Sequence, residues 1–213
     1  MEGAIDTLLI LVVLSGLYML ATSDLVAAIR ATALQGLVLA LLPLLVRGHV
    51  DLHGAALGAG TLALKVFAIP TLLRAALRRA GVNREVEPLL GFGASLSLAG
   101  VLVVLSIALG QRLAVPGAPP SSLLVPCAFA TVLIGLLILV GRTKALTQVL
   151  GYLVLENGIF LFGLAVLRAM PLIVELGVLL DILVAVFVMG IVMHKIRRTF
   201  DHIDTHAMTE LRD

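Results

Sequence analysis

The sequence predicts an all-α integral membrane protein built as a bundle of seven transmembrane helices. Two observations predict this class. The 213-residue chain is 61% hydrophobic, with a mean hydropathy of +1.16, and only 13% of its residues are charged, against roughly 25% in soluble domains. The apolar residues also form runs that match the roughly 20 residues a helix needs to cross a bilayer. We expect a single membrane domain over residues 1–213 and a multi-pass protein of the inner (plasma) membrane.

Short connections separate the predicted spans. The seven spans are Ile5–Thr22, Leu25–Val46, Gly54–Leu77, Leu89–Leu109, Leu123–Gly141, Leu146–Leu167 and Leu172–Lys195. The leading segment of the first span, Met1–Asp6, is acidic. A cleaved signal peptide begins with basic residues, so we expect a retained helix. Pro70 should kink the third span, because proline frees a backbone carbonyl. Gly110–Ser122, with three prolines, is the longest connection.

The basic residues predict the orientation, because Lys and Arg gather on the cytoplasmic side of a membrane protein. With the N-terminus outside and the C-terminus inside, eleven basic residues lie on the inner side and three on the outer side. The inner set is Arg30, Arg74, Arg78, Arg79, Arg84, Arg142, Lys144, Lys195, Arg197, Arg198 and Arg212, and the outer set is Arg47, Arg112 and Arg168. The opposite orientation would reverse this ratio.

Several kinds of chemistry are missing from the sequence. A single cysteine, Cys127, cannot form an internal disulfide or hold an iron–sulfur cluster. The five histidines lack metal-ligand spacing, and no phosphate-binding glycine loop or catalytic Ser or Cys arrangement occurs. The small net charge does not suggest nucleic acid. We therefore expect no catalytic residues, metal or cofactor in this chain, and no nucleic-acid partner.

Three ionisable residues lie deep inside apolar runs: Lys65, Glu156 and Asp181. Each charge at that depth costs roughly 2.5–3.5 kcal/mol on insertion scales. Glu156 and Asp181 fall about ten residues, or about 15 Å, into two consecutive spans, so antiparallel packing would bring them to similar depth. Carboxyl groups removed from water can exchange protons near neutral pH. We predict a proton relay of these two acids, with Lys65 as the opposing charge or a proton carrier itself.

Weaker candidates and a structural explanation stand beside the relay. Gln35, Asn157 and Glu175 are possible secondary relay residues, although Gln35 suits helix packing better and Glu175 lies near the outer interface. The less favoured structural explanation is a static ion pair between Lys65 and Asp181 that orients helices, with a protonated Glu156 hydrogen-bonded to a neighbouring helix.

Several stretches resemble the hydrogenase-4 component E family. They are Lys65–Pro70, Arg142–Lys144, Gly151–Gly158, the run with Glu175, Asp181 and Lys195–Arg198, and the tail from Ile203 to Leu211. The last three spans, within residues 123–213, are also similar to the K subunit of respiratory complex I and the C subunit of Mrp-type cation/proton antiporters. Asp181 matches the acid in that family's third helix, whereas Glu156 lies about one turn from its second-helix acid. Residues 1–122 form an additional four-helix part.

The resemblance implies a non-redox membrane-arm subunit of a complex I-like hydrogenase or formate hydrogenlyase-type complex. Its expected partners are antiporter-like and complex I-like membrane subunits and a peripheral redox arm. The chain itself would be a non-catalytic subunit of an oxidoreductase. Three other functions stay open: a subunit of an Mrp-type antiporter without a redox partner, a structural membrane scaffold, and, less well supported, a stand-alone transporter.

Overall fold

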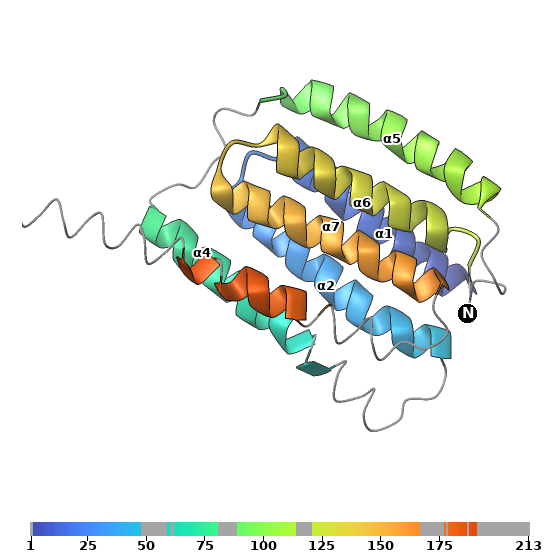
Figure 1. The fold of residues 1–213 in the computed structure, drawn as a ribbon, viewed down its shortest axis with the longest axis horizontal. Coiled ribbons are helices and arrows are strands. Elements are labelled where there is room, and N and C mark those ends of the chain that lie inside the picture. The colour runs from blue at the N-terminus through green and yellow to red at the C-terminus, as the bar shows by residue number, and fades with distance from the viewer. Residues whose placement is uncertain are drawn as a thin grey trace, which may run out of the picture.

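The computed structural model describes residues 2–47, 59–60, 62–80, 89–113, 121–166, 177, 179–186 and 188–190. Its elements are helices, labelled as in Figure 1. They are α1 (Glu2–Ala21), α2 (Leu25–Arg47), the π-helix η1 (Ala63–Ala68), α4 (Ile69–Ala80), α5 (Phe92–Arg112), α6 (Leu124–Gly141) and α7 (Ala145–Val166), followed by the apolar helix Leu179–Gly190.

Five of these helices are long and apolar enough to cross a membrane: α1, α2, α5, α6 and α7. They coincide, within a few residues, with five of the seven spans expected from the sequence. The third expected span is described from residue 62 onward as η1 and α4, and the seventh as helix Leu179–Gly190. The described part of the chain is therefore that of an all-helical membrane protein.

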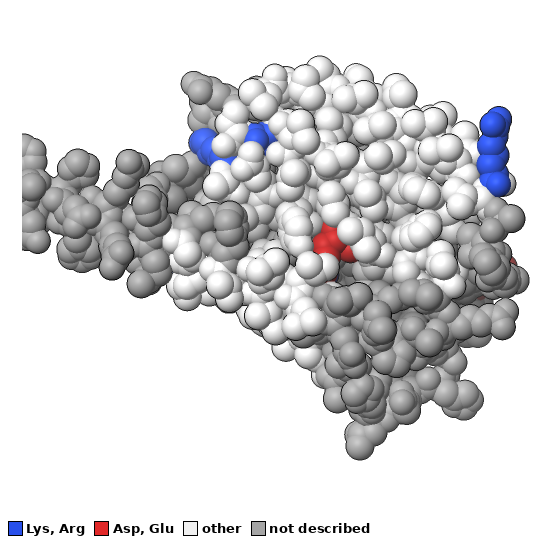
Figure 2. Space-filling view, in the orientation of Figure 1, with Lys and Arg blue, Asp and Glu red and all other residues white. Residues whose placement is uncertain are grey.

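Figure 1 shows how the helices are layered. Helices α6 and α7 lie side by side, and α1 and α2 pack behind them, α1 against α6 and α2 against α7. Helix α5 runs along one edge, against α6 and α1, and α4 occupies the opposite edge, against α2. Figure 2 shows basic side chains at the two ends of the described face and a broad, mostly uncharged band between them, with one acidic patch near its middle.

The turn between α1 and α2 is made by local polar contacts. The Asp24 carboxylate accepts a hydrogen bond from the backbone N–H of Val26 at 2.8 Å, and the Thr22 hydroxyl accepts one from the Asp24 backbone N–H at 3.2 Å. Asp24 thus caps the first turn of α2, where backbone N–H groups have no partner within the helix. This short turn makes α1 and α2 antiparallel neighbours.

Glycines allow the backbones of α6 and α7 to approach closely. A Cβ atom added at Gly151 would lie 2.7 Å from the backbone nitrogen of Leu139, and one at Gly158 would lie 2.5 Å from that of Val132. Gly135 of α6 meets the backbone of Leu155 in the same way. Small residues at such contacts are the main means of packing helices in membranes, where no hydrophobic driving force acts between them.

Arg142, one of the basic residues assigned to the inner side, is a buried contact between helices. It is 2% exposed, its Nη2 donates a hydrogen bond of 2.7 Å to the carbonyl of Leu20, and its guanidinium lies 4.6 Å from the centre of the Phe92 ring. Leu20 lies in the last turn of α1 and Phe92 begins α5. A basic group at a helix C-terminus bonds carbonyls that the helix leaves unpaired. Arg142 therefore joins the ends of α1, α5 and α6.

Candidate functional site

Lys65 is presented by a widened turn of helix. It lies in η1, where the backbone N–H of Ile69 donates to the carbonyl of Leu64, five residues earlier. The next residue, Pro70, has no N–H to donate, so the regular pattern of backbone bonds cannot continue through it. The disturbance that the sequence predicted at Pro70 thus takes the form of a π-helix over Ala63–Ala68. Such turns are rare and frequently occur at functional sites.

The three charged residues predicted to form the relay meet in the structure. Lys65 Nζ lies 2.8 Å from Oε1 of Glu156 and 3.6 Å from Oδ1 of Asp181. All three are buried, with exposed fractions of 7%, 2% and 0% respectively. η1, α7 and helix Leu179–Gly190 each contribute one of them. The lysine is therefore hydrogen-bonded to one acid and within ion-pair distance of the other.

Two amide side chains extend this cluster across the bundle. Lys65 Nζ also donates to Oδ1 of Asn157 at 2.9 Å, and Asn157 Nδ2 donates to Oε1 of Gln35 at 3.1 Å. Gln35 Nε2 in turn donates to the backbone carbonyl of Val12 at 2.9 Å. A connected set of polar contacts thus runs from Asp181 to α1 and ties five helical elements together. Two of the three secondary candidates belong to it.

The acids are less well satisfied than the lysine and the amides. Oε2 of Glu156 and both carboxylate oxygens of Asp181 are buried without a hydrogen-bond partner in the part of the chain that the structure describes. A buried carboxylate oxygen without a donor is costly, and a shared proton or a water molecule relieves that cost. A cavity of about 10 Å³, lined by Thr32, Lys65 and Asn157 together with Ile69 and Leu153, adjoins the cluster. This is close to the space of one water molecule.

A glycine that the sequence did not single out makes room for the cluster. A Cβ atom at Gly36 would lie 2.7 Å from Cβ of Lys65, which is closer than Cβ atoms pack. Gly36 therefore lets α2 approach η1 closely enough for Lys65 to reach α7. Its position directly after Gln35 in an apolar span was the available signal, because small and polar residues mark the inner face of a membrane helix.

The remaining predicted residue, Glu175, lies outside the described residues, as do the five histidines. In the ranges that are described, no group of three or more His, Cys, Asp or Glu side chains is placed to hold a metal ion. The site is thus a compact charge cluster of one cation and two carboxyl groups.

Comparison with known proteins identifies the family. The chain is 30% identical to "Hydrogenase-4 component E" of Escherichia coli (strain K12) over 148 residues, which cover 70% of this chain and 68% of that protein, and the figures for the Shigella flexneri protein of the same name are equal. The chain belongs to the hydrogenase-4 component E family. An uncharacterised protein of Mycobacterium tuberculosis (strain ATCC 25618 / H37Rv) is 40% identical over 195 residues, which cover 89% of this chain and 87% of its own length. No family model and no solved structure matches the chain.

Membership in the hydrogenase-4 component E family confirms the resemblance seen in the sequence. Three of the stretches that carried it contribute directly to the site, one of them through Asp181. Lys65–Pro70 supplies the lysine and the proline that follows the π-helix. Gly151–Gly158 supplies Glu156, Asn157 and two glycines that pack on α6. In this component E family member the residues behind the resemblance are thus the residues that build the buried charge cluster.

Proposed function

We propose that this chain is a membrane subunit of an inner-membrane hydrogenase complex and that Lys65, Glu156 and Asp181 carry protons within its membrane arm. The name of its relatives, hydrogenase-4 component E, supports its place in a hydrogenase complex. The contact of one buried cation with two buried carboxyl groups, at 2.8 and 3.6 Å, is the observation that carries the relay. The site is electrically neutral when one of the two carboxyl groups holds a proton, and neutrality is strongly favoured away from water.

The unequal distances indicate how such a site would work. With Lys65 on Glu156, the ionised form of Glu156 is stabilised and the proton resides on Asp181. If the proton passes from the Asp181 hydroxyl to the Glu156 carboxylate, Asp181 becomes the anion and Lys65 moves toward it. The site charge is the same before and after this step. The lysine therefore follows the negative charge, and the proton moves the opposite way between the two acids.

Asn157 and Gln35 act in this proposal as positioning residues rather than as proton carriers, because amides do not titrate near neutral pH. Asn157 accepts from Lys65 and donates to Gln35, which is itself held by the Val12 carbonyl. This orientation holds an acceptor in front of the lysine in either state of the acids. Glu175 is kept as a further carrier of the same path.

The test uses isosteric variants in the assembled complex. Glu156→Gln and Asp181→Asn each keep the shape of the side chain and remove its titration. We expect each to lower proton transport into inverted membrane vesicles by on the order of tenfold or more, within the contribution that positioned proton-transfer groups make. Electron transfer from the peripheral arm to an artificial acceptor should persist, and Lys65→Met should change the pH dependence of transport. Ser106→Ala on α5, whose hydroxyl bonds within its own helix, is the matched control.

If both acid variants transport protons at the wild-type rate, the cluster is a structural ion pair and the chain is a scaffold. The co-purifying polypeptides separate the two remaining assemblies. A large subunit with nickel-binding cysteines supports the hydrogenase, whereas antiporter subunits without a redox partner support an Mrp-type complex.

We further propose seven transmembrane helices with the N-terminus outside. The eleven-to-three distribution of basic residues supports this orientation. Arg142 is buried, so the exposed neighbour Thr143 is the better labelling position on the inner side. A cysteine replacing Arg112 should react with a membrane-impermeant maleimide from outside, and one replacing Thr143 only from the cytoplasmic side. The reverse result would invert the topology.

A further inference from the structure

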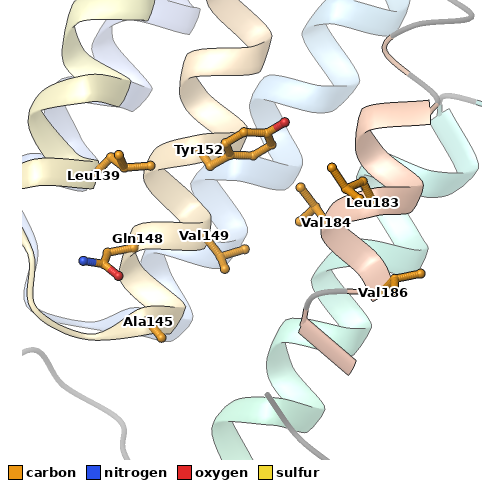
Figure 3. Close-up of a pocket in the computed structure, with 8 residues that line it drawn as sticks. All are labelled: Leu139, Ala145, Gln148, Val149, Tyr152, Leu183, Val184 and Val186. Atoms are coloured by element: carbon orange, nitrogen blue, oxygen red, sulfur yellow. The ribbon is translucent and has the colours of Figure 1, made fainter. Parts of the chain in front are cut away.

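A second cavity, larger and almost wholly apolar, lies between α7 and helix Leu179–Gly190. Its volume is about 450 Å³, and it is lined by Leu139, Ala145, Gln148, Val149, Tyr152, Leu183, Val184 and Val186. Figure 3 shows Val149 and Tyr152 projecting from α7 toward the helix that carries Leu183 and Val184. The pocket adjoins the relay, because Tyr152 lies one turn before Glu156 and Val184 nearly one turn after Asp181.

We propose that this pocket binds one acyl chain of a membrane phospholipid. The lining suits hydrocarbon: six of its eight residues are Ala, Val or Leu. The pocket also lies beside lipid-facing surface, because Leu183 and Val186 are 60% and 65% exposed. An apolar pocket next to bilayer hydrocarbon takes up an acyl chain without desolvating any polar group.

The volume of the pocket favours an acyl chain as the molecule that fills it. A cavity of roughly 150 Å³ holds one benzene ring, so about 450 Å³ has room for on the order of 18 carbon atoms. An α-helix with its side chains is about 10–12 Å across, and two turns of it fill on the order of 900 Å³. The pocket therefore has room for a fatty acyl chain and is too small to enclose even a short helical segment.

A bound acyl chain would set the separation of the two helices that carry the relay acids, a consequence that rests on the proposed function. It would lie between α7, which carries Glu156, and the helix that carries Asp181. Lys65 reaches the two acids at 2.8 and 3.6 Å, so a small change in this separation alters which acid it pairs with. Occupancy of the pocket would then favour one state of the acid pair over the other.

Photolabelling of the intact complex in native-lipid membranes tests the site. The probe is a phosphatidylglycerol with a diazirine on one acyl chain, followed by peptide mapping. We expect saturable labelling of peptides that contain Tyr152 and Val184. Ala145→Phe narrows the mouth at an exposed position, and Val184→Phe fills the interior; each should lower this labelling about tenfold, equivalent to about 1.4 kcal/mol of binding free energy. Val140→Phe, on the exposed face of α6 and outside the pocket, should leave it unchanged.

Several results would overturn the proposal. Labelling spread evenly over all lipid-facing helices would mean that only bulk lipid contacts the chain. Cross-linking of the same residues to another subunit would assign the pocket to a protein partner, and displacement by an isoprenoid chain but not by added phospholipid would assign it to a different lipid. Loss of labelling in Ala145→Phe with unchanged proton transport would refute the control of the relay while leaving the lipid site. Glu156→Gln should retain labelling, so a failure of the relay itself is recognised separately.

Discussion

Helices α7 and α5 are alike in length and apolar character but differ in how they pack. They contain 22 and 21 residues, yet 61% of the α7 span is buried inside the bundle against 17% of the α5 span. Glycines of α7 meet the backbone of α6, whereas a Cβ at Gly93 or Gly100 of α5 would meet nothing within 4 Å, and only Gly110 in the last turn of α5 closely approaches α6. The buried residues of α5 are the small Ser95, Ala99 and Ser106. In a membrane, apolar content does not select the inner helices, because lipid is as apolar as leucine; small and polar residues do.

Introducing the same side chain at a glycine of each helix should give the largest difference. In Gly158→Val the new Cβ lies 2.5 Å from the Val132 backbone nitrogen, so α6 must move. We expect a loss of at least about 3 kcal/mol of stability, the upper range for overpacking. Gly100→Val should change stability by less than about 0.5 kcal/mol. Thermal unfolding of the complex in mild detergent measures both, and equal effects would show that close backbone contact does not distinguish the two helices.

Removing the buried cation should have the next largest effect. Lys65→Met leaves Glu156 and Asp181 facing each other without their counter-charge, which we expect to cost about 3–5 kcal/mol. Adding Glu156→Gln to this variant should recover most of the loss, because it removes the anion that Lys65 neutralised. Arg112→Met at the exposed end of α5 should be neutral. Unfolding midpoints of the three variants give the comparison, and a double variant as unstable as Lys65→Met would argue against charge as the cause.

Arg142, at the end of α6, contacts α1 and α5, and a conservative replacement should loosen the packing of α5 in particular. Arg142→Lys keeps the charge but loses the planar group that lies over Phe92 and bonds the Leu20 carbonyl. We expect a loss of about 1–2 kcal/mol. Hydrogen exchange should quicken in the first turns of α5 and little in α7. Arg78→Lys at an exposed position provides the control; faster exchange spread evenly over the bundle would contradict this role.

The smallest expected effect concerns the amide at the far end of the cluster. Gln35→Leu removes the acceptor of Asn157 and the donor to the Val12 carbonyl. Hydrogen bonds between membrane helices average about 0.6 kcal/mol, so we expect a loss of about 1 kcal/mol for the two. Ser106→Ala, whose hydroxyl bonds only the Leu102 carbonyl of its own α5, should change stability less. Equal losses in thermal unfolding would show that the hydrogen bonds of Gln35 stabilise the bundle no more than one bond within a single helix does.

Much of the site could be predicted from the sequence because burying a charge in a membrane is expensive. Lys65, Glu156 and Asp181 are conspicuous in apolar runs, and equal depth in consecutive spans correctly suggested that the two acids lie near one another. Gln35 and Asn157 were predicted as members of the site but not as a hydrogen-bonded pair. Gly36 was missed, since its role depends on a contact with a residue 29 positions away in the chain. The pairing of Lys65 with Glu156 rather than with Asp181 alone was likewise not predictable.

The sequence by itself determined the helical membrane class, the approximate ends of five spans and the identity of the buried charges. These follow from hydropathy and solvation, which act residue by residue. Only the tertiary structure decided which helices lie inside, that Arg142 is a buried connection between α1 and α5, and which oxygen Lys65 contacts. Those outcomes depend on backbone approach between distant segments, where one missing Cβ or one widened turn before Pro70 moves a side chain toward or away from its partner.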